Sequence, residues 1–374
     1  MYTTKPRSMF MSHPEVALQP PPEGHISSGC LVVDDTDAGG AAVDTCCWGT
    51  CFRTRVRELP FPQNLVLTVE YREGSAENRR TYSEDVVFVP VPGQPLASNR
   101  YYVVIAKGKH KKGLVRACSR AEDMTPCCCW MQINDAKPRQ FDPNDVYQQI
   151  EVVPHRRRRG WFTARAVAAD GIPCLTFRKK YWAVYASKPK SFDLGEASGI
   201  SASLRSSHEL AGATVPTGKW YCPFFLVKED GVAPWQQMDR SMFYELTLVQ
   251  QWEPVHELIG IGVGGGSKLA SKNALIGGGV EATQESAAGS SQHGDAYVWF
   301  RAASTGQRVG LCASVWERMR WEEYRRGWVD DEADAENVAG GSVLVERFVF
   351  KRMDGSVAVA FDFVHLNIVW EDQL

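Results

Sequence analysis

The alternation of apolar and polar positions predicts a chain built mainly of β-strands. Between Leu59 and Ile105, three apolar runs, LVLTVEY, DVVFVPV and RYYVVI, are separated by segments rich in Gly, Ser, Asn and Pro, which favour turns over helix. Pro90 cannot donate a ladder hydrogen bond, so the middle strand is expected to end there or to lie at an edge. Alternate apolar residues of the first strand are expected to face a core: Leu65, Leu67, Val69 and Tyr71.

The rest of the chain continues this pattern. GCLVVDD, starting at Gly29, predicts an earlier strand, and later β-like runs are YWAVYAS, WYCPFFLV, MFYELTLVQQW and YVWFRA. Near the C-terminus, SVLVERFVFKRM and SVAVAFDFVHLNIVW flank Asp354-Gly355, which predicts a hairpin closed by a two-residue turn with positive φ. Both of its strands carry apolar residues on both faces, so this hairpin is expected to be covered by another layer.

One segment has the pattern of a helix, about residues 315–326. Ser314 and Glu317 have the spacing of a capping box, Glu322 and Arg326 that of a favourable ion pair, and Gly327 suits the C-cap. The predicted fold is therefore mainly β, with α+β at the margin: antiparallel sheets and hairpins with one clear C-terminal helix that packs on a sheet.

The length of 374 residues favours two domains. The run HRRRRGW interrupts the apolar pattern at His155–Trp161, and we place the boundary there. The prediction is an N-terminal β-rich half, residues 1–155, with two cysteine clusters. The second half, residues 160–374, carries a Gly-rich segment, the helix and the terminal hairpin.

Composition indicates a soluble protein without a global attraction to nucleic acid. The hydrophobic content of 44%, the charged content of 23% and the net charge of -2 are ordinary, so any anion binding must come from a local patch. Residues 1–24 contain no signal-peptide pattern, and no run approaches the roughly 20 apolar residues of a spanning helix. We expect a cytoplasmic protein, or one that is nuclear or peripherally attached to a membrane, whose eleven cysteines are reduced.

Two cysteine clusters are the most unusual feature. They have the patterns CCxxxC and CCC and are weak metal-site candidates: Cys46, Cys47, Cys51, Cys127, Cys128 and Cys129. Thiolates can hold zinc, but adjacent cysteines of an extended chain point to opposite sides. S-acylation and plain structural thiols are the alternatives. We expect no cofactor, and no catalytic constellation is visible, because the sequence places none of the eight histidines beside a cysteine.

Two basic runs are candidates for contact with phosphates of lipid or nucleic acid. KGKHKKG contains Lys109, Lys111 and Lys112. HRRRRG contains Arg156, Arg157, Arg158 and Arg159, and the following Trp161 and Phe162 could stack on a ligand. The alternative is that both runs are solvated loops.

The Gly-rich segment allows a membrane hypothesis. GIGVGGGSK, from Gly260 to Lys268, contains GxGxxG, but no helix pattern follows, so nucleotide binding is not predicted. Between Glu257 and Glu285, small and apolar residues alternate with polar ones, and the membrane-facing candidates are Ile259, Ile261, Val263, Ile276 and Val280. In pattern alone this resembles the insertion hairpins of aerolysin-type pore-forming proteins. An edge hairpin or a flexible loop is the alternative, and the arms are shorter than the roughly ten residues needed to span.

Several longer motifs resemble a plant family known as domain of unknown function 1262. These are LPFPQN, ENRRT and FVPVPGQPLASNRYYVV, together with MYTTKPRSMF, KPRQFDPNDVYQQIEV, YVWFRA and RVGLCASVWERMRW. The resemblance implies a plant source and a family unit spanning the chain, and it supplies no catalytic residues. Residues 260–291 depart from it by being richer in Gly, Ala and Ser.

These observations favour a non-catalytic binding protein with a protein partner or a membrane surface as its target. A stress- or defence-related role is implied by family association alone. The alternatives are an aerolysin-like pore-former that uses residues 257–285, and a thiol- or zinc-dependent enzyme that uses the cysteine clusters.

Overall fold

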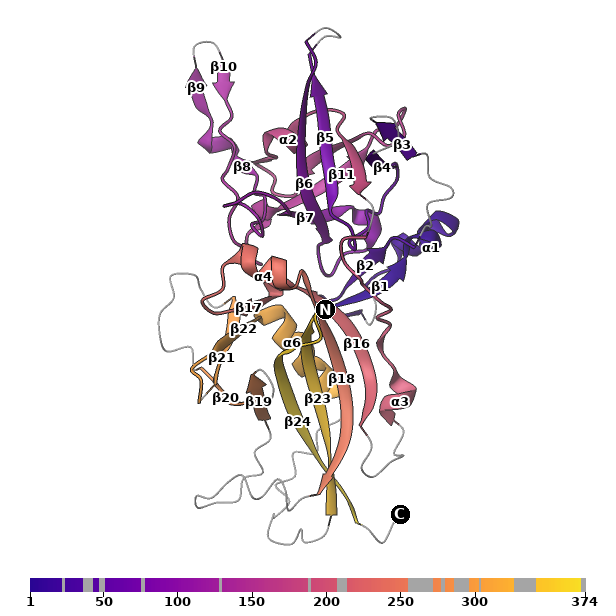
Figure 1. Ribbon diagram of the computed structural model, residues 1–374, viewed down its shortest axis with the longest axis vertical. Coiled ribbons are helices and arrows are strands. Elements are labelled where there is room, and N and C mark those ends of the chain that lie inside the picture. The colour runs from indigo at the N-terminus through magenta and orange to yellow at the C-terminus, as the bar shows by residue number, and fades with distance from the viewer. Residues whose placement is uncertain are drawn as a thin grey trace. The chain divides into compact units, whose positions relative to one another are not determined.

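A computed structural model of the chain (Figure 1) describes residues 1–21, 24–35, 43–46, 51–74, 78–127, 130–187, 190–206, 214–254, 272–276, 280–285, 296–302, 304–325 and 341–370. It forms two compact units. The N-terminal unit comprises Tyr2–Glu196 and Ala233–Asp239, and the C-terminal unit comprises Met1, Ala197–Val232 and Arg240–Leu374. The main division follows Glu196, whereas the sequence predicts it near residues 155–160. That basic run is a hairpin loop inside the N-terminal unit, because the strands on either side of it pair with each other.

An antiparallel sheet forms the body of the N-terminal unit. Its order is β12-β11-β7-β6-β5-β14-β4-β3. The strands are β3 Val43–Cys46, β4 Cys51–Val56, β5 Leu67–Glu73, β6 Arg80–Pro90, β7 Arg100–Ile105, β11 Gln149–Pro154, β12 Phe162–Ala166 and β14 Ala183–Ser187. An isolated bridge between Phe162 and Trp182 joins β12 to the residue before β14. The six strands β12, β11, β7, β6, β5 and β14 therefore close around a common interior.

Aromatic side chains fill this interior. Phe61, Phe88, Phe162 and Trp182 are each 0% exposed. The Phe61 ring centroid lies 4.7 Å from that of Phe88 and 5.1 Å from that of Phe162. The three predicted strands are confirmed as β5, β6 and β7, with β6 ending at Pro90. The face predicted to lie on the core is buried as expected: Leu65, Leu67, Val69 and Tyr71.

The other elements of the N-terminal unit are short. They are β1 Tyr2–Pro6, α1 Arg7–Ser12, η1 Pro14–Leu18, β2 Gly29–Val33, η3 Leu96–Ser98, β8 Ser119–Arg120, η4 Ala121–Asp123, β9 Thr125–Cys127, β10 Trp130–Gln132, η5 Val146–Gln148, β13 Gly171–Ile172, α2 Leu175–Arg178 and α4 Pro234–Arg240. β1 and β2 pair in parallel. β9 pairs with β10, and β8 with β13, both antiparallel.

The LPFPQN motif has a structural role. The Leu59–Pro60 peptide is cis. The Gln63 side chain is fully buried, where its Oε1 accepts from the Val32 amide at 2.6 Å and its Nε2 donates to the Phe61 carbonyl at 2.5 Å. Because both polar atoms of this amide bond to backbone, Gln63 secures β2 beside the sheet.

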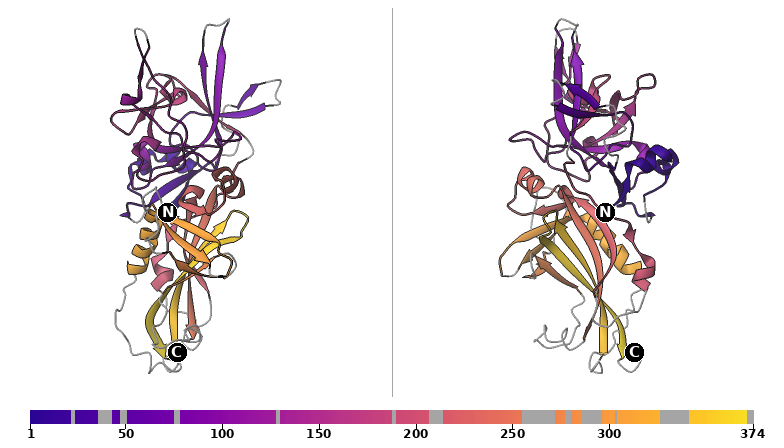
Figure 2. Two further views of the ribbon diagram at one scale, coloured as in Figure 1. Left: turned by 90° about the vertical axis from the view of Figure 1, so that its left-hand side faces the viewer. Right: turned by 45° about the vertical axis from the view of Figure 1, so that its right-hand side comes forward.

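A second, larger antiparallel sheet forms the C-terminal unit, in the order β17-β22-β21-β20-β19-β24-β23-β18-β16, with β15 paired to β16. The strands are β15 Gly199–Ile200, β16 Val215–Pro223, β17 Val227–Glu229, β18 Phe243–Pro254, β19 Lys272–Ile276, β20 Val280–Gln284, β21 Tyr297–Ala302, β22 Arg308–Cys312, β23 Gly341–Arg352 and β24 Val357–Trp370. The helices are α3 Ala202–Ser206, η6 Phe224–Leu226 and α6 Ala313–Arg325. The long strands β18, β23 and β24 are visibly curved (Figure 2).

The predicted C-terminal helix is confirmed as α6, and it packs on the sheet through Trp316, whose ring lies 5.4 Å from Phe300 and 5.3 Å from Phe361. Its start differs from the prediction, because α6 begins at Ala313 and so includes Ser314. Glu322 is paired with Arg318, and Arg326 lies outside the described residues.

The predicted C-terminal hairpin is confirmed as β23 and β24, but its turn is wider than expected. The amide of Arg352 donates to the Ser356 carbonyl at 2.8 Å, so three residues form the loop. Gly355 alone among them has a positive φ, +83°. This geometry is that of a three-residue loop with glycine in the left-handed position.

Candidate functional site

The N-terminal unit contains an open cavity of about 930 Å³, which we call the lysine cavity. It lies against the paired strands β5 and β6, two loop segments and the start of α2. The lining residues are Tyr71, Tyr82, Ser83, Glu84, Asp85, Lys107, Gly108, His110, Lys111, Leu114, Arg116, Asp135, Ala136, Lys137, Pro138, Cys174, Leu175 and Thr176. This volume is within the range of sites for small molecules, roughly 300–1,000 Å³.

The basic loop that follows β7 contributes one wall. Gly108 and Gly113 have φ of +117° and +78°, conformations that favour glycine. A Cβ on Gly113 would lie 2.6 Å from the Pro234 carbonyl oxygen, so only glycine lets the loop approach α4 this closely. Lys112 forms an ion pair with Asp239 of α4. The base of the loop is therefore held by α4, and Lys111 lies on the side of the cavity.

Each carboxylate of the cavity already has a cationic partner. The pairs are Glu84 with Arg116, Asp85 with Lys107 at 3.7 Å, and Asp135 with Arg178 at 3.4 Å. Burial lowers the pKa of Arg116, but the hydrogen bonds and charge of Glu84 raise it above its usual value. Asp85 also accepts a hydrogen bond from the Thr68 hydroxyl at 2.7 Å. The negative charge of the cavity is thus matched within its own walls.

Two lysines remain without such a partner. Within the part of the chain that the structure describes, no carboxylate lies in ion-pair distance of Lys111 or Lys137. Both are exposed, as is His110. Of the predicted anion contacts, only Lys111 lines the cavity. Lys109 is exposed in the same loop, and Lys112 forms an ion pair with Asp239. Lys137 was not predicted, because it lies in a separate loop with no run of basic residues.

An aromatic pair forms another part of the wall. The rings of Tyr71 and Tyr82 are stacked, with centroids 4.8 Å apart and an angle of 10°. Tyr71 is buried, whereas Tyr82 is 39% exposed and offers its outer face to the solvent. One carboxylate oxygen of Glu84, Oε2, is buried without a hydrogen-bond partner among the described residues. A ligand with a flat ring and a hydrogen-bond donor could use both groups.

Cys174, which is 4% exposed, also lines the cavity. Burial raises the pKa of Cys174. A thiol held protonated is a poor nucleophile. The arrangement therefore suits the binding of an anion better than covalent chemistry.

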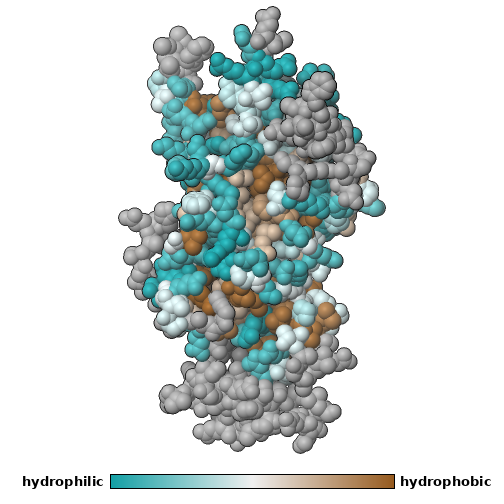
Figure 3. All heavy atoms as spheres, viewed as in Figure 1, coloured by the Kyte–Doolittle hydropathy of each residue, from teal (hydrophilic) through white to brown (hydrophobic). Residues whose placement is uncertain are grey.

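The arginine run forms the loop between β11 and β12. Arg156, Arg157 and Arg158 are exposed, and Arg159 pairs with Glu58 at 2.5 Å. The predicted stacking by Phe162 is wrong, because Phe162 is fully buried in the core. On the face of the N-terminal unit seen in Figure 3, hydrophilic residues cover most of the described surface.

The cysteine clusters lie largely outside the described side chains. Along the backbone, Cys46 is opposite Cys51 in the β3–β4 register, and Cys127 is opposite Trp130. Cys47, Cys128 and Cys129 are outside the described residues. Among the described side chains no group of His, Cys, Asp or Glu is placed to hold a metal ion. The metal hypothesis for the clusters stays a prediction.

Part of the predicted membrane hairpin is described. Ile259, Ile261 and Val263 are outside the described residues. Ile276 is 1% exposed and is opposite Val280 in the β19–β20 register. Because β19 also pairs with β24, and β20 with β21, these strands are interior members of the sheet. No described helix is long and apolar enough to cross a membrane.

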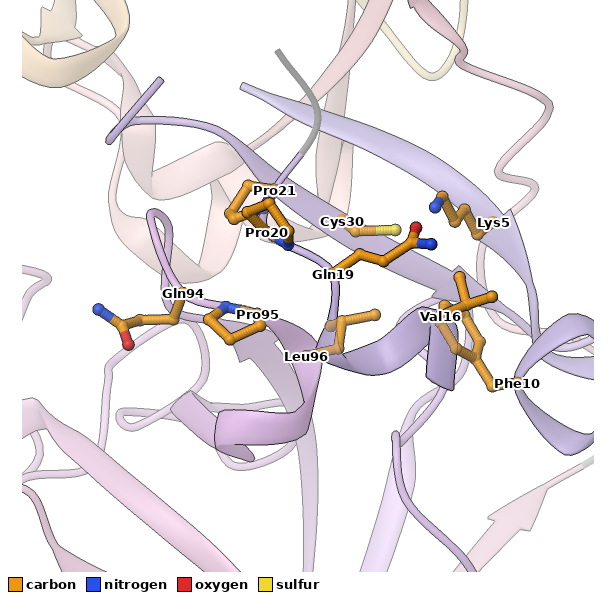
Figure 4. A pocket seen from close by; sticks show the side chains of 10 residues that line it. All are labelled: Lys5, Phe10, Val16, Gln19, Pro20, Pro21, Cys30, Gln94, Pro95 and Leu96. Carbon is orange, nitrogen blue, oxygen red and sulfur yellow. The ribbon is translucent and has the colours of Figure 1, made fainter. Parts of the chain in front are cut away.

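A second pocket lies beside β1 and β2 and has a volume of only about 20 Å³ (Figure 4). In this view Pro20 and Pro21 lie to the left of Cys30, and Lys5 lies to its right. Burial raises the pKa of the Cys30 thiol to about 11. The space is about that of one water molecule, so this pocket is a packing gap and not a ligand site.

One of the comparisons with known proteins matches the family resemblance. Residues 23–129 match the family model described as "Protein of unknown function (DUF1262)". No curated protein matches the chain. Among solved structures, the crystal structure of Cry35Ab1 is similar over 82% of this chain and 88% of that chain, with 11% sequence identity and a TM-score of 0.41.

Proposed function

We propose that this protein is a non-catalytic binding protein whose N-terminal unit holds a small anionic molecule in the lysine cavity. The observation that carries the proposal is a pair of lysines, Lys111 and Lys137, that have no carboxylate partner among the described residues. They line a cavity in which each carboxylate has a cationic partner. A phosphate or carboxylate that bridged the two ammonium groups would complete the charge balance.

The other walls indicate the rest of the ligand. The exposed face of Tyr82 can take a flat ring, and Glu84 Oε2 can accept a hydrogen bond from a ligand hydroxyl or amine. The chemical class is therefore a phosphorylated or carboxylated ring compound that carries a donor group. Because both lysines are exposed, each contact should contribute roughly tenfold in affinity, the low end for charged hydrogen bonds.

Calorimetric titration with three probes tests this proposal: phenyl phosphate, methyl phosphate and phenol. Phenyl phosphate is expected to bind most tightly, because it offers both the anion and the ring. Methyl phosphate should bind more weakly, and phenol should not bind measurably. The double variant Lys111→Ala, Lys137→Ala should lose about a hundredfold in affinity for phenyl phosphate.

The matched control is Lys190→Ala, Lys351→Ala, which removes the same charge away from the cavity. The proposal is wrong if both double variants bind phenyl phosphate equally, or if phenol binds as well as its phosphate. Slow release of phosphate from phenyl phosphate by the wild-type protein would show instead that the cavity is catalytic.

The other functional hypotheses stay predictions. Dye release from vesicles, with and without residues 260–291, tests the pore-forming hypothesis. Metal analysis of protein purified under reducing conditions tests the thiol- or zinc-dependent enzyme. The plant source, the cytoplasmic location and the stress- or defence-related role rest on the family resemblance and on composition.

A further inference from the structure

A group of unpaired arginines gathers at one end of the β11–β12 hairpin. Arg156, Arg157 and Arg158 are all exposed, and no carboxylate of the described residues lies within ion-pair distance of any of them. The loop approaches the end of β4, where a Cβ on Gly160 would lie 3.1 Å from Arg57, which is also exposed. The described acid beside the loop, Glu58, is occupied by Arg159.

The loop has a defined conformation. The Nδ1 atom of His155 accepts hydrogen bonds from the amides of Arg157 and Arg158 at 3.1 and 3.0 Å. The amide of His155 donates to the Trp161 carbonyl at 2.8 Å, and the Gly160 carbonyl accepts from Arg55 Nη2 at 3.1 Å. Because these bonds fix the loop backbone, the exposed arginines are carried on a preorganised tip, which lowers the entropy cost of binding.

A strained tyrosine lies beside this tip. Tyr181 has φ of +71°, which is unusual for a bulky residue, and its side chain is 43% exposed. Its ring meets that of His155 edge to face, with centroids 4.7 Å apart. The preceding residue, Lys180, is exposed and adds a further cation. Strained residues of this kind are concentrated at binding sites.

We infer that this arginine tip, together with Lys180 and Tyr181, docks the N-terminal unit onto an anionic lipid surface. An exposed group of cations with a tyrosine beside it suits a layer of phosphate headgroups, because aromatic rings prefer the membrane interface. Single-stranded nucleic acid is less suited, because its bases need free aromatic faces. Arg55 already covers the Trp161 ring at 4.6 Å, and His155 contacts Tyr181.

Vesicle sedimentation with the full chain tests the inference. Wild-type protein should sediment with phosphatidylcholine vesicles that contain phosphatidylserine and remain in the supernatant with phosphatidylcholine alone. The triple variant Arg156→Ala, Arg157→Ala, Arg158→Ala should lose roughly a hundredfold in partitioning, since each basic residue near an anionic surface contributes on the order of fivefold. Raising the salt concentration should also weaken the binding of wild-type protein to the anionic vesicles, because salt screens the attraction.

The control variant Arg79→Ala, Lys190→Ala, Arg320→Ala removes the same three charges from exposed positions elsewhere and should sediment like wild type. Titration with phenyl phosphate, which depends on the lysine cavity alone, separates this inference from the proposed function. Equal loss in the two triple variants would overturn the inference, as would binding to uncharged vesicles. Absence of vesicle binding combined with arginine-dependent binding of an RNA oligonucleotide would replace lipid by nucleic acid.

Discussion

The substitution Arg205→Met in α3 should strongly destabilise the C-terminal unit. Arg205 lies between two carboxylates that are each 0% exposed, Glu322 of α6 and Glu346 of β23. Its Nε and Nη2 atoms donate to the two oxygens of Glu346 at 2.8 and 2.7 Å, and Nη1 donates to Glu322 at 3.1 Å. Nη2 also donates to the Glu322 carbonyl at 2.6 Å.

The magnitude follows from what the variant leaves behind. Glu322 keeps its ion pair with Arg318, and Glu346 keeps the hydrogen bond from Gln250 at 2.8 Å but loses the two hydrogen bonds and the positive charge of Arg205. A buried carboxylate that loses its cation costs about 3–5 kcal/mol in the free energy of unfolding. Methionine fills most of the volume of arginine, so little of this loss is due to a cavity.

The expected pH dependence identifies the cause. Without Arg205, desolvation should raise the pKa of Glu346 in the folded state above its unfolded value. Below its unfolded pKa, such a group is protonated in both states and does not destabilise the fold. As the pH rises above that value, the unfolded state can ionise more easily than the folded state, so the group increasingly destabilises the fold. The deficit of Arg205→Met relative to wild type should therefore be smaller at about pH 5 than at about pH 8.

Urea unfolding followed by hydrogen exchange of β23 peptides measures this deficit in the C-terminal unit alone. The control Arg320→Met, at an exposed position of α6, should change the free energy of unfolding by less than about 0.5 kcal/mol. A loss below about 1 kcal/mol for Arg205→Met, or a deficit independent of pH, would refute the reasoning.

Three further predictions concern the same unit. Burial raises the pKa of Glu229, but hydrogen bonds from Arg352 and Tyr244 bring this pKa below the ordinary 4.5. The ionised carboxylate therefore stabilises the fold above pH 4.5, and this stabilisation is lost as the pH falls below that value. Acid unfolding of Glu229→Gln should depend less on pH than that of wild type, and parallel unfolding curves would contradict this. Gly218→Ala would place a Cβ 2.5 Å from the Trp220 ring and should cost about 1–3 kcal/mol in thermal or urea unfolding, whereas an unchanged midpoint would show that the ring can move. Burial raises the pKa of the Cys222 thiol to about 11, so iodoacetamide should modify Cys222 only after unfolding, as measured by peptide mass spectrometry; equal rates for native and unfolded protein would contradict its burial.

Local pattern was sufficient to predict most of the strands and the C-terminal helix. The alternation in β5, the proline at the end of β6 and the Asp-Gly turn between β23 and β24 act through neighbouring residues, so they can be recognised without a structure. Details of the ends were less predictable, because competing bonds decide them. Ser314 joined the helix where a cap was expected, and the terminal hairpin took a three-residue loop.

The candidate site was predicted only in part. Lys111 and the arginines were found because basic residues in a run are visible in the sequence. Lys137 and Tyr82 carry no such pattern, and they join Lys111 in one cavity only because the sheet of the N-terminal unit brings their segments together. The sequence also allowed Phe162 to stack on a ligand, whereas closure of the sheet buries it.

The amino-acid order thus specifies which segments become strands, where turns interrupt them and which stretches carry charge, since these depend on contacts over a few residues. Tertiary structure decides which charges are neutralised. Arg205 pairs with Glu346, 141 positions away in the chain, and both side chains are buried, whereas Lys111 has no carboxylate within ion-pair distance among the described residues. Long-range packing determines which side chains become neighbours. The charged and polar groups that this packing leaves unpaired are the ones available to bind a ligand.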